Sequence, residues 1–198
     1  NPPPPWPAAP AWPAVRGWRK ATRAVLIARR LAVPPSERAR RDAAIAALVE
    51  RELERRAIRR LGFYWPFKGE FDPRPLVRRL HARGVLLALP VVVARGAPLV
   101  FRPWAPGSRL VPGVWNIPVP AEGDPVTPDV LLVPLVGFDA GRYRLGYGGG
   151  YYDRTLAAMT PRPFAIGIGF ALSRLAGIHP QPHDVPMDLI ITEEGAGG

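Results

Sequence analysis

The sequence predicts an α/β protein with three layers, α/β/α, around a largely parallel sheet. Two observations support this prediction. Apolar segments typical of strands alternate with segments of helical periodicity, and the segment VLLVPLVGFD (130–139) is continuously apolar, which is typical of a strand covered on both faces. A chain of 198 residues, 47% of them apolar, can bury one sizeable core. We therefore expect a single domain over residues 16–198, preceded by a proline-rich disordered tail over residues 1–15.

Two helices open the predicted domain. Over residues 16–33, apolar side chains recur at spacings of three and four and predict one buried stripe, made of Trp18, Ala21, Val25, Ala28 and Ala32. The arginines of this helix fall largely on its other side. Pro34 and Pro35 end the helix, and Ser36 can cap a second helix that runs to about residue 58. The many Arg and Glu residues of the second helix are most simply a solvated face.

The remaining elements alternate between strand and helix. Strands are predicted for residues 61–67, 85–93, 98–104, 130–139, 163–170 and 187–193. A helix begins at Asp72 and Pro73, an N-cap followed by proline at the first helical position, and Gly84 ends it. A short helix over residues 151–159 follows a glycine-rich loop. Because ligands of open α/β sheets bind beyond the carboxyl ends of the strands, this loop is the first candidate for a binding site.

Composition limits the classes of function. The formal net charge is +11, and of the 27 basic residues only Lys20 and Lys68 are lysines. The arginine excess indicates either a surface that attracts a polyanion or biased codon usage, with many arginines simply solvating helix faces. The absence of cysteine excludes disulfides and a thiolate nucleophile. No apolar run is long enough to cross a membrane, and the proline-rich start lacks the pattern of a signal peptide. We therefore expect a soluble, cytoplasmic protein.

The glycine-rich loop is the strongest local sign of binding. It reads RLGYGGGYYDR from Arg144 to Arg154. Stacked backbone N–H groups followed by a helix N-terminus form an anion site, and the flanking arginines favour phosphate; the alternative is a flexible glycine turn. The spacing fits neither a Walker loop nor the G-x-G-x-x-G dinucleotide motif. Asp153 is either a ligand of the magnesium that accompanies a nucleotide or a first-turn aspartate favoured by the helix dipole.

Longer stretches of the chain resemble one known family. The segment VPLVGFDAGRYRLGYGGGYYDRTL (133–156) strongly resembles the signature of the 5-formyltetrahydrofolate cyclo-ligase family, also called 5,10-methenyltetrahydrofolate synthetase. Further segments resemble its conserved blocks in the same order, namely RKATRAVLIARRLAVPPSER, YWPFKGEFDPRPLV, VWNIPVPAEGD and HDVPMDLIITEEG. The resemblance extends over about residues 18–195. It implies a three-layer α/β fold and the ATP-dependent, magnesium-dependent cyclisation of 5-formyltetrahydrofolate to 5,10-methenyltetrahydrofolate, with release of ADP and phosphate.

The same resemblance implies the residues that bind ATP and magnesium. The ATP-binding stretch would be Arg144, Leu145, Gly146, Tyr147, Gly148, Gly149, Gly150, Tyr151 and Tyr152. Within it, Arg144 and Tyr151 are expected to act in catalysis. Asp153 and Asp184 match the magnesium-associated aspartates of the family.

The resemblance also implies a folate site. Glu70 matches the acidic residue that binds the folate, through donors of the pterin ring, and Trp65 lies near the matching substrate wall. Trp115 offers a stacking surface for a flat pterin or benzoyl ring, and the alternative for Trp115 is a place in the core. The expected partner is thus a small molecule, 5-formyltetrahydrofolate with or without a polyglutamate chain, and we expect a monomer.

The chain departs from the family in the loop. Many members carry a lysine there, as GKG, whereas this chain has three glycines. Positive charge must therefore come from Arg144 or from the N-terminal helix. The family's basic pair in that helix sits four residues apart, a spacing that Arg19 and Arg23 fit, and the adjacent Lys20 could substitute. The alternative is that these side chains are only a solvated face.

Two other functions compete with the cyclo-ligase. One keeps the fold and the ATP site but changes the substrate. The other is a basic nucleic-acid-binding module, which predicts aromatic and basic residues interleaved on one surface; the aromatic residues instead cluster around loops expected at strand ends. His179 and His183 are four residues apart, but the prolines between them prevent a shared helix face, so no zinc pair is predicted.

Overall fold

Helices and strands alternate along the part of the chain that the structure, a computed structural model, describes: residue 2 and residues 11–197. The helices are α1 (Trp12–Leu31), α2 (Pro35–Arg55), α3 (Arg74–Ala82) and α4 (Tyr151–Ala158), with short 3-10 turns η1 (Val114–Asn116) and η2 (Ala171–Ser173). The strands are β1 (Arg60–Gly62), β2 (Leu86–Val91), β3 (Val100–Trp104), β4 (Leu110–Pro112), β5 (Pro118–Pro120), β6 (Val130–Pro134), β7 (Gly137–Phe138), β8 (Arg144–Leu145), β9 (Phe164–Ile168), β10 (Leu189–Thr192) and β11 (Gly195–Gly197).

The central sheet is largely parallel, as predicted. Its strand order is β11-β10-β9-β6-β1-β2-β3. All neighbours from β10 to β2 pair in parallel, whereas the edge strands β11 and β3 are antiparallel to their neighbours. The carboxyl ends of the parallel strands therefore meet at one edge of the sheet.

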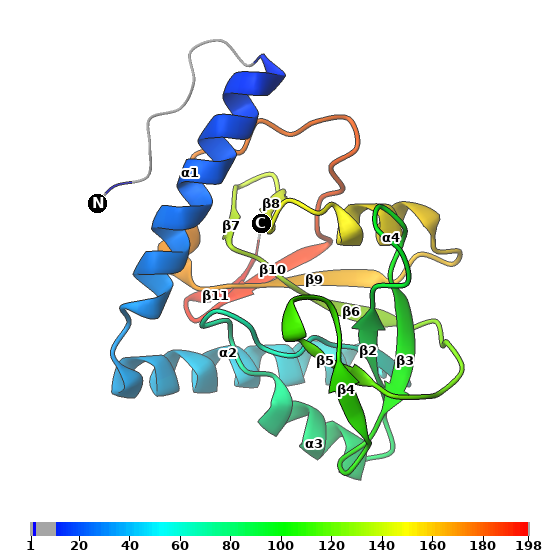
Figure 1. Ribbon diagram of the computed structural model, residues 1–198. Coiled ribbons are helices and arrows are strands. Elements are labelled where there is room, and N and C mark those ends of the chain that lie inside the picture. Colours follow the sequence, from blue (N-terminus) through cyan, green and yellow to red (C-terminus); the bar gives the residue numbers. More distant parts are fainter. Residues whose placement is uncertain (1, 3–10, 198) are drawn as a thin grey trace.

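Helices cover both faces of this sheet and complete the three layers (Figure 1). Val130 and Leu132 of β6 pack into one core cluster with side chains of α2 and α3. The alternate residues Leu131 and Val133 pack into a second cluster with Leu156 of α4. Because side chains along a strand alternate between faces, this pattern explains why β6 reads as continuously apolar.

The predicted strand over residues 130–139 is shorter than expected. Regular pairing of β6 stops at Pro134, and Gly137–Phe138 instead form β7, which pairs antiparallel with β8. Proline has no N–H to donate to a ladder, so it commonly ends a strand. The break lifts the β7–β8 hairpin out of the sheet and positions the glycine loop beyond the carboxyl ends. A second hairpin, β4–β5, was not predicted and carries η1 at its tip.

The buried face of α1 differs from the prediction. Of the expected stripe only Trp18 is buried; the buried residues are Val15, Trp18, Arg19, Thr22, Leu26 and Arg30. Ala21, Ala28 and Ala32 are exposed. The helix also begins at Trp12, so the tail predicted for residues 1–15 is too long; residues 1 and 3–10 lie outside the described residues. The side chains of α1 pack against the β7–β8 hairpin and the segment 175–178.

The solvated face predicted for the second helix is confirmed in its C-terminal half, whereas Arg38 and Arg41 are half-buried and contact Gly69 and Glu193 of other segments. Glu50 and Glu52 of α2 pair with arginines of α2, its C-terminal end and α3 at distances of 2.7–3.1 Å. Exposed pairs of this kind are worth about 0–1 kcal/mol each, so they contribute solubility more than stability. None of the helices that the structure describes combines the length and the apolar character needed to cross a membrane.

Candidate active site

A cavity of about 830 Å³ opens at the carboxyl ends of the parallel strands. Its walls come from α1, the segment after β1, the end of β2, the β4–β5 hairpin, the glycine loop with α4, and residues 182–185. Nearly all predicted site residues line it, namely Arg19, Arg23, Trp65, Glu70, Trp115, Arg144, Leu145, Gly146, Tyr147, Gly148, Gly149, Gly150, Tyr151, Tyr152, Asp153 and Asp184. Lys20 is the exception: it is exposed on α1 and does not line the cavity.

The glycine loop has the backbone of an anion site. Gly148 and Gly150 have φ of 98° and 68°, in the left-handed region where a side chain is strained. Gly150 is the N-cap of α4, so the first N–H groups of the helix adjoin the loop at the cavity wall. Gly149 lies outside that region, but an added Cβ would come within 2.8 Å of the ring of Tyr151. The loop therefore has a backbone conformation that favours glycine at Gly148 and Gly150.

Two arginines without carboxylate partners border this loop. Arg23 Nε donates to the carbonyl of Gly146, and Arg144 Nη1 donates to the carbonyl of Pro134 at 3.0 Å. In the described part of the chain neither forms an ion pair, and Arg144 Nε is buried without a hydrogen-bond partner. Burial, and then the nearby charges of Arg19 and Arg144, lower the pKa of Arg23. Guanidinium groups gathered in this way favour an anionic ligand.

Arg19 is held differently from Arg23. Its Nη2 donates to Asp184 Oδ2 at 2.6 Å and to the carbonyl of His179 at 2.9 Å, and both side chains of the ion pair are nearly buried. Arg19 and Arg23 do share the cavity-facing side of α1, as their spacing predicts. Arg19 nevertheless has a carboxylate partner, so its charge is largely compensated, whereas that of Arg23 is not.

Asp153 and Asp184 both line the cavity. Asp153 Oδ1 accepts a hydrogen bond from the N–H of Val185 at 3.0 Å, which joins α4 to the segment that carries Asp184. Among the residues described, no three His, Cys, Asp or Glu side chains gather as a metal cluster. Two carboxylates still fit magnesium, because this ion is usually bound by one or two carboxylates, phosphate oxygens and water.

A buried carboxylate, Glu70, also lines the cavity. Glu70 is only 7% exposed. Its Oε1 accepts from the hydroxyl of Tyr147 at 2.7 Å, and its Oε2 accepts from the N–H of Phe67 at 3.2 Å. Burial raises the pKa of Glu70 to about 7, although the hydrogen bond from Tyr147 and the charge of Arg30 act against the rise. A carboxyl poised in this range can ionise when a ligand supplies donors.

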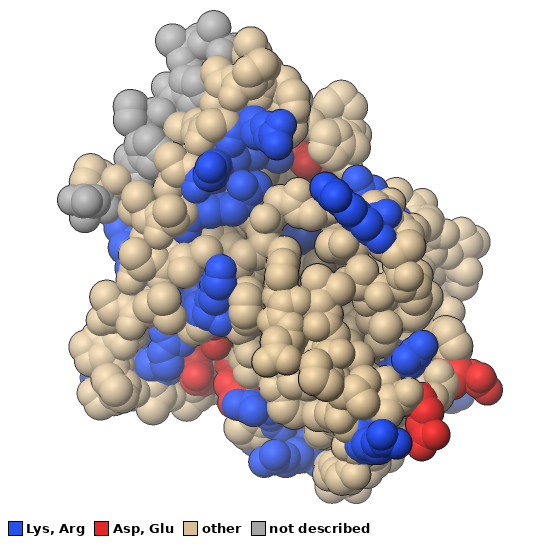
Figure 2. Space-filling model, viewed as in Figure 1, with Lys and Arg blue, Asp and Glu red and all other residues tan. Residues whose placement is uncertain are grey.

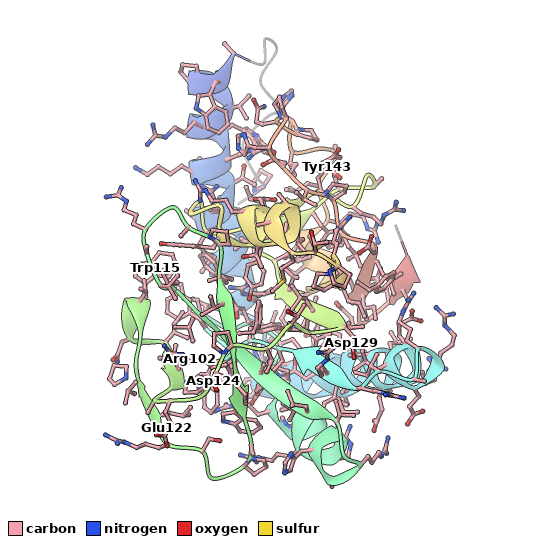
Figure 3. The ribbon with its side chains drawn as sticks, turned by 90° about the vertical axis from the view of Figure 1, so that its right-hand side faces the viewer. Arg102, Trp115, Glu122, Asp124, Asp129 and Tyr143 are labelled. Atoms are coloured by element: carbon pink, nitrogen blue, oxygen red, sulfur yellow. The ribbon has the colours of Figure 1, made fainter. Side chains whose placement is uncertain are left out.

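An aromatic wall stands beside Glu70. Trp115 lies in η1 at the tip of the β4–β5 hairpin (Figure 3) and is 56% exposed, so its placement in the core is wrong. Its ring stacks on Phe67 with centroids 6.1 Å apart and meets Tyr147 edge-on at 6.1 Å. Trp65 packs edge-on against Trp104 at 6.4 Å. These rings offer flat apolar surfaces to a planar ligand.

Several cavity residues were missed by the sequence analysis. Trp12, placed in the tail, is 45% exposed and lies edge-on to His183, with centroids 6.3 Å apart. Phe67 and the β4–β5 hairpin were also missed. A usable sign was present for α1, since Trp12, Arg19, Arg23 and Arg30 recur at helical spacings. No comparable periodicity marks the hairpin.

Basic side chains gather over α1 on the face of the molecule shown in Figure 2, beside a hollow in the surface. Toward the lower edge of that face, Lys and Arg side chains lie beside Asp and Glu side chains. The positive charge at α1 is therefore concentrated next to the cavity.

Comparisons with known proteins agree on one family. The sequence profile of the 5-formyltetrahydrofolate cyclo-ligase family matches residues 15–193. The 5-formyltetrahydrofolate cyclo-ligase of Escherichia coli K12 is 34% identical over 133 residues, 64% of this chain and 73% of that protein. That of Haemophilus influenzae is 29% identical over 149 residues, 70% of this chain and 79% of that protein.

A solved structure agrees with these sequence matches. The NMR structure of Aquifex aeolicus 5,10-methenyltetrahydrofolate synthetase superposes with a TM-score of 0.79 and 27% identity, covering 90% of this chain and 91% of that one. The fold, the cavity and the sequence matches all lead to the same conclusion. The chain is an enzyme of the 5-formyltetrahydrofolate cyclo-ligase family.

Proposed function

We propose that this enzyme cyclises 5-formyltetrahydrofolate to 5,10-methenyltetrahydrofolate at the expense of ATP, releasing ADP and phosphate. The observation that carries the proposal is a single cavity lined by two chemically different groups of residues, which we call its two ends. One end has the glycine loop, the N-terminus of α4 and uncompensated arginines, which suit a triphosphate. The other has Glu70 among aromatic rings, which suits a pterin. Two reactants held in one cavity lose little further entropy when they react.

The chemistry requires a leaving group on a poor electrophile. The formyl oxygen attacks the γ-phosphorus of ATP, the bond to the bridging oxygen breaks, and ADP leaves. N10 then attacks the formyl carbon, the oxygen departs with the phosphoryl group as phosphate, and the N10 proton passes to solvent. Such a sequence depends on charge neutralisation and alignment more than on a protein nucleophile. The chain has no cysteine to act as one.

Named residues supply that neutralisation and alignment. Arg23 and Arg144 neutralise phosphate oxygens, the loop N–H groups donate to them, and Tyr151 packs beside the loop. Asp153 and Asp184 would hold Mg²⁺, which supplies further positive charge to the triphosphate. Glu70 accepts hydrogen bonds from pterin donors and so fixes the orientation of the substrate. The rings of Trp65 and Trp115 hold its flat portion.

The test is product formation. Purified protein mixed with 5-formyltetrahydrofolate and MgATP should give the absorbance rise of the methenyl product, and omission of ATP, magnesium or folate should abolish the rise. Absence of both the methenyl product and ATP hydrolysis would contradict the proposal. Folate-independent ATP hydrolysis without methenyl product would favour an enzyme of the same fold with another substrate. Two further properties stay predictions. Sedimentation of the purified enzyme should show a monomer, and cell fractionation should find it in the cytoplasm.

A further inference from the structure

A buried arginine on α1 has no assigned role. Arg30 is 2% exposed, and in the described part of the chain no carboxylate pairs with it directly. Its three nitrogens instead donate to three different groups: Nε to the carbonyl of Lys68 at 2.9 Å, Nη1 to the carbonyl of Leu135 at 3.3 Å and Nη2 to the hydroxyl of Tyr147 at 2.8 Å. A buried cation requires such compensation, so this geometry is costly to disturb.

Arg30 fixes the direction of a hydrogen-bond chain. A guanidinium can only donate, so the hydroxyl of Tyr147 accepts from Arg30 and must direct its own proton elsewhere. That proton goes to Glu70 Oε1, 2.7 Å away. These hydrogen bonds thus connect a buried cation, through a hydroxyl, to a buried carboxylate. The Tyr147 hydroxyl donates to one oxygen of Glu70 and the Phe67 N–H donates to the other, so together they set the orientation of the carboxylate.

Tyr147 belongs to both ends of the cavity. Its hydroxyl contacts Glu70, whereas its backbone lies in the glycine loop between Gly146 and Gly148. The carbonyl of Gly146 in turn accepts from Arg23, the uncompensated arginine of the phosphate end. Glycines on both sides leave the loop backbone with much conformational freedom, so a side-chain anchor at Tyr147 restricts the whole loop.

We propose that Tyr147, held by Arg30, is a positioning residue that couples the binding of the two substrates. This inference rests on the proposed function, because it takes Glu70 as the folate end and the loop as the nucleotide end. Folate bound to Glu70 immobilises Tyr147 and with it the loop, so the nucleotide then binds a loop that is already ordered. The coupling is reciprocal, since each ligand must change the affinity of the other by the same factor.

The experiment measures that factor by calorimetry. The dissociation constant of 5-formyltetrahydrofolate is determined with and without a non-hydrolysable ATP analogue and magnesium. The wild type should show tightening within the range of about 5- to 150-fold typical of coupled sites. Tyr147→Phe keeps the ring but removes the hydroxyl, and it should bring the factor close to one.

Three further variants separate positioning from a general structural role. Arg30→Lys keeps the charge but loses the three-way fork; it should lose the same coupling, and the double variant should lose no more than either single one. If Arg30→Lys does not fold, as shown by circular dichroism, the Tyr147→Phe measurement decides. Tyr143→Phe is the matched control: it removes a hydroxyl between β7 and β8, outside the cavity and apart from Trp115 in Figure 3, and should retain wild-type coupling.

The outcomes distinguish this inference from the proposed function. Wild-type coupling in Tyr147→Phe, or an equal loss in Tyr143→Phe, would overturn the inference. A wild-type enzyme that forms methenyl product but shows a factor of one would also overturn it, with the function intact. Failure of the wild type to bind 5-formyltetrahydrofolate at all would count against the proposed function instead.

Discussion

The helices α1 and α2 have nearly the same length, 20 and 21 residues, and both are rich in arginine, yet most of these arginines find partners of different kinds. In α2, glutamates at helical spacings pair with arginines on the surface. In α1 there is no acidic residue between Trp12 and Leu31. Its arginines find partners in other parts of the chain: Asp184, several backbone carbonyls and the hydroxyl of Tyr147.

The acidic residues of an arginine-rich helix indicate where its arginines find partners. Where acidic residues alternate with arginine, the helix satisfies its own charges and can face water. Where they are absent, the cations are available to other segments or to a ligand. In this protein the acid-free helix borders the cavity and the acid-rich helix covers the far face of the sheet. Substitutions in both helices and in the cavity wall test this contrast.

Arg19→Ala should have the largest effect on stability. It leaves Asp184 nearly buried without its guanidinium partner, and breaking a buried pair costs about 3–5 kcal/mol. The matched variant Arg79→Ala removes an exposed pair with Glu50 of α2 and should cost about 1 kcal/mol or less. Urea unfolding of both variants measures the two free energies. Equal losses of unfolding free energy in the two variants would mean that the ion pair of α1 is no more important for stability than that of α2.

Arg23→Ala should impair ATP binding rather than the fold. Its guanidinium has no carboxylate partner among the residues described, so its removal leaves no buried charge uncompensated. Loss of hydrogen bonds to a charged phosphate corresponds to about 1.5–3 kcal/mol, or roughly 10- to 100-fold in kcat/KM for ATP. Steady-state kinetics should show the KM for folate little changed. Arg16→Ala, an exposed position on the same helix, is the control. Unchanged ATP kinetics in Arg23→Ala would make Arg23 a solvated residue.

Glu70→Gln tests the carboxylate that α1 reaches through Tyr147. Folate affinity should fall about 10- to 100-fold, as for a charged hydrogen bond, while ATP binding stays nearly intact. The wild type should also depend on pH: burial raises the pKa of the free Glu70 to about 7, so the ionised form, which the pterin donors require, is gained as pH rises through 7. Folate affinity should therefore increase across this range and level off above it. Glutamine should remove the pH dependence, and a Glu70→Gln enzyme with a wild-type pH profile would contradict the assignment.

Much of the fold could be predicted because the patterns were local. The alternation of strands and helices, the two-faced burial of β6 and the glycine loop each follow from residues close together in the sequence. The stripe of α1 could not be predicted in the same way. Arg19 and Arg30 are buried because Asp184 and Tyr147, more than a hundred residues away, accept their hydrogen bonds. The spacing of apolar residues along a helix carries no information about such distant hydrogen-bond partners.

In the candidate site, too, some features follow from the local sequence and others depend on distant residues. The residue types of the loop are enough to indicate phosphate, whereas the different roles of Arg19 and Arg23 depend on where Asp184 lies. Likewise, Trp115 is exposed because the backbone turns at the tip of a hairpin, with φ of 54° at Trp115 and 59° at Asn116. Its sequence context gave equal reason to place it in the core. Family resemblance predicted a role for this segment but not its geometry.

Trp115→Ala should have the smallest effect, and one independent of charge. Because the ring is 56% exposed, its removal should hardly change the free energy of unfolding. It stacks on Phe67 at the folate end, and an aromatic stacking contact is worth about 0.5–1.5 kcal/mol, so the KM for folate should rise about 2- to 12-fold. Trp115→Phe should retain most of the affinity.

Added salt separates the contribution of charge from that of stacking. It should weaken ATP binding at the arginines of α1 but leave the ratio of wild-type to Trp115→Ala folate affinity unchanged, because salt screens charges and not stacking. If this ratio of folate affinities changes with salt, the charges of α1 also act at the aromatic wall, and the two ends of the cavity are not electrostatically separate.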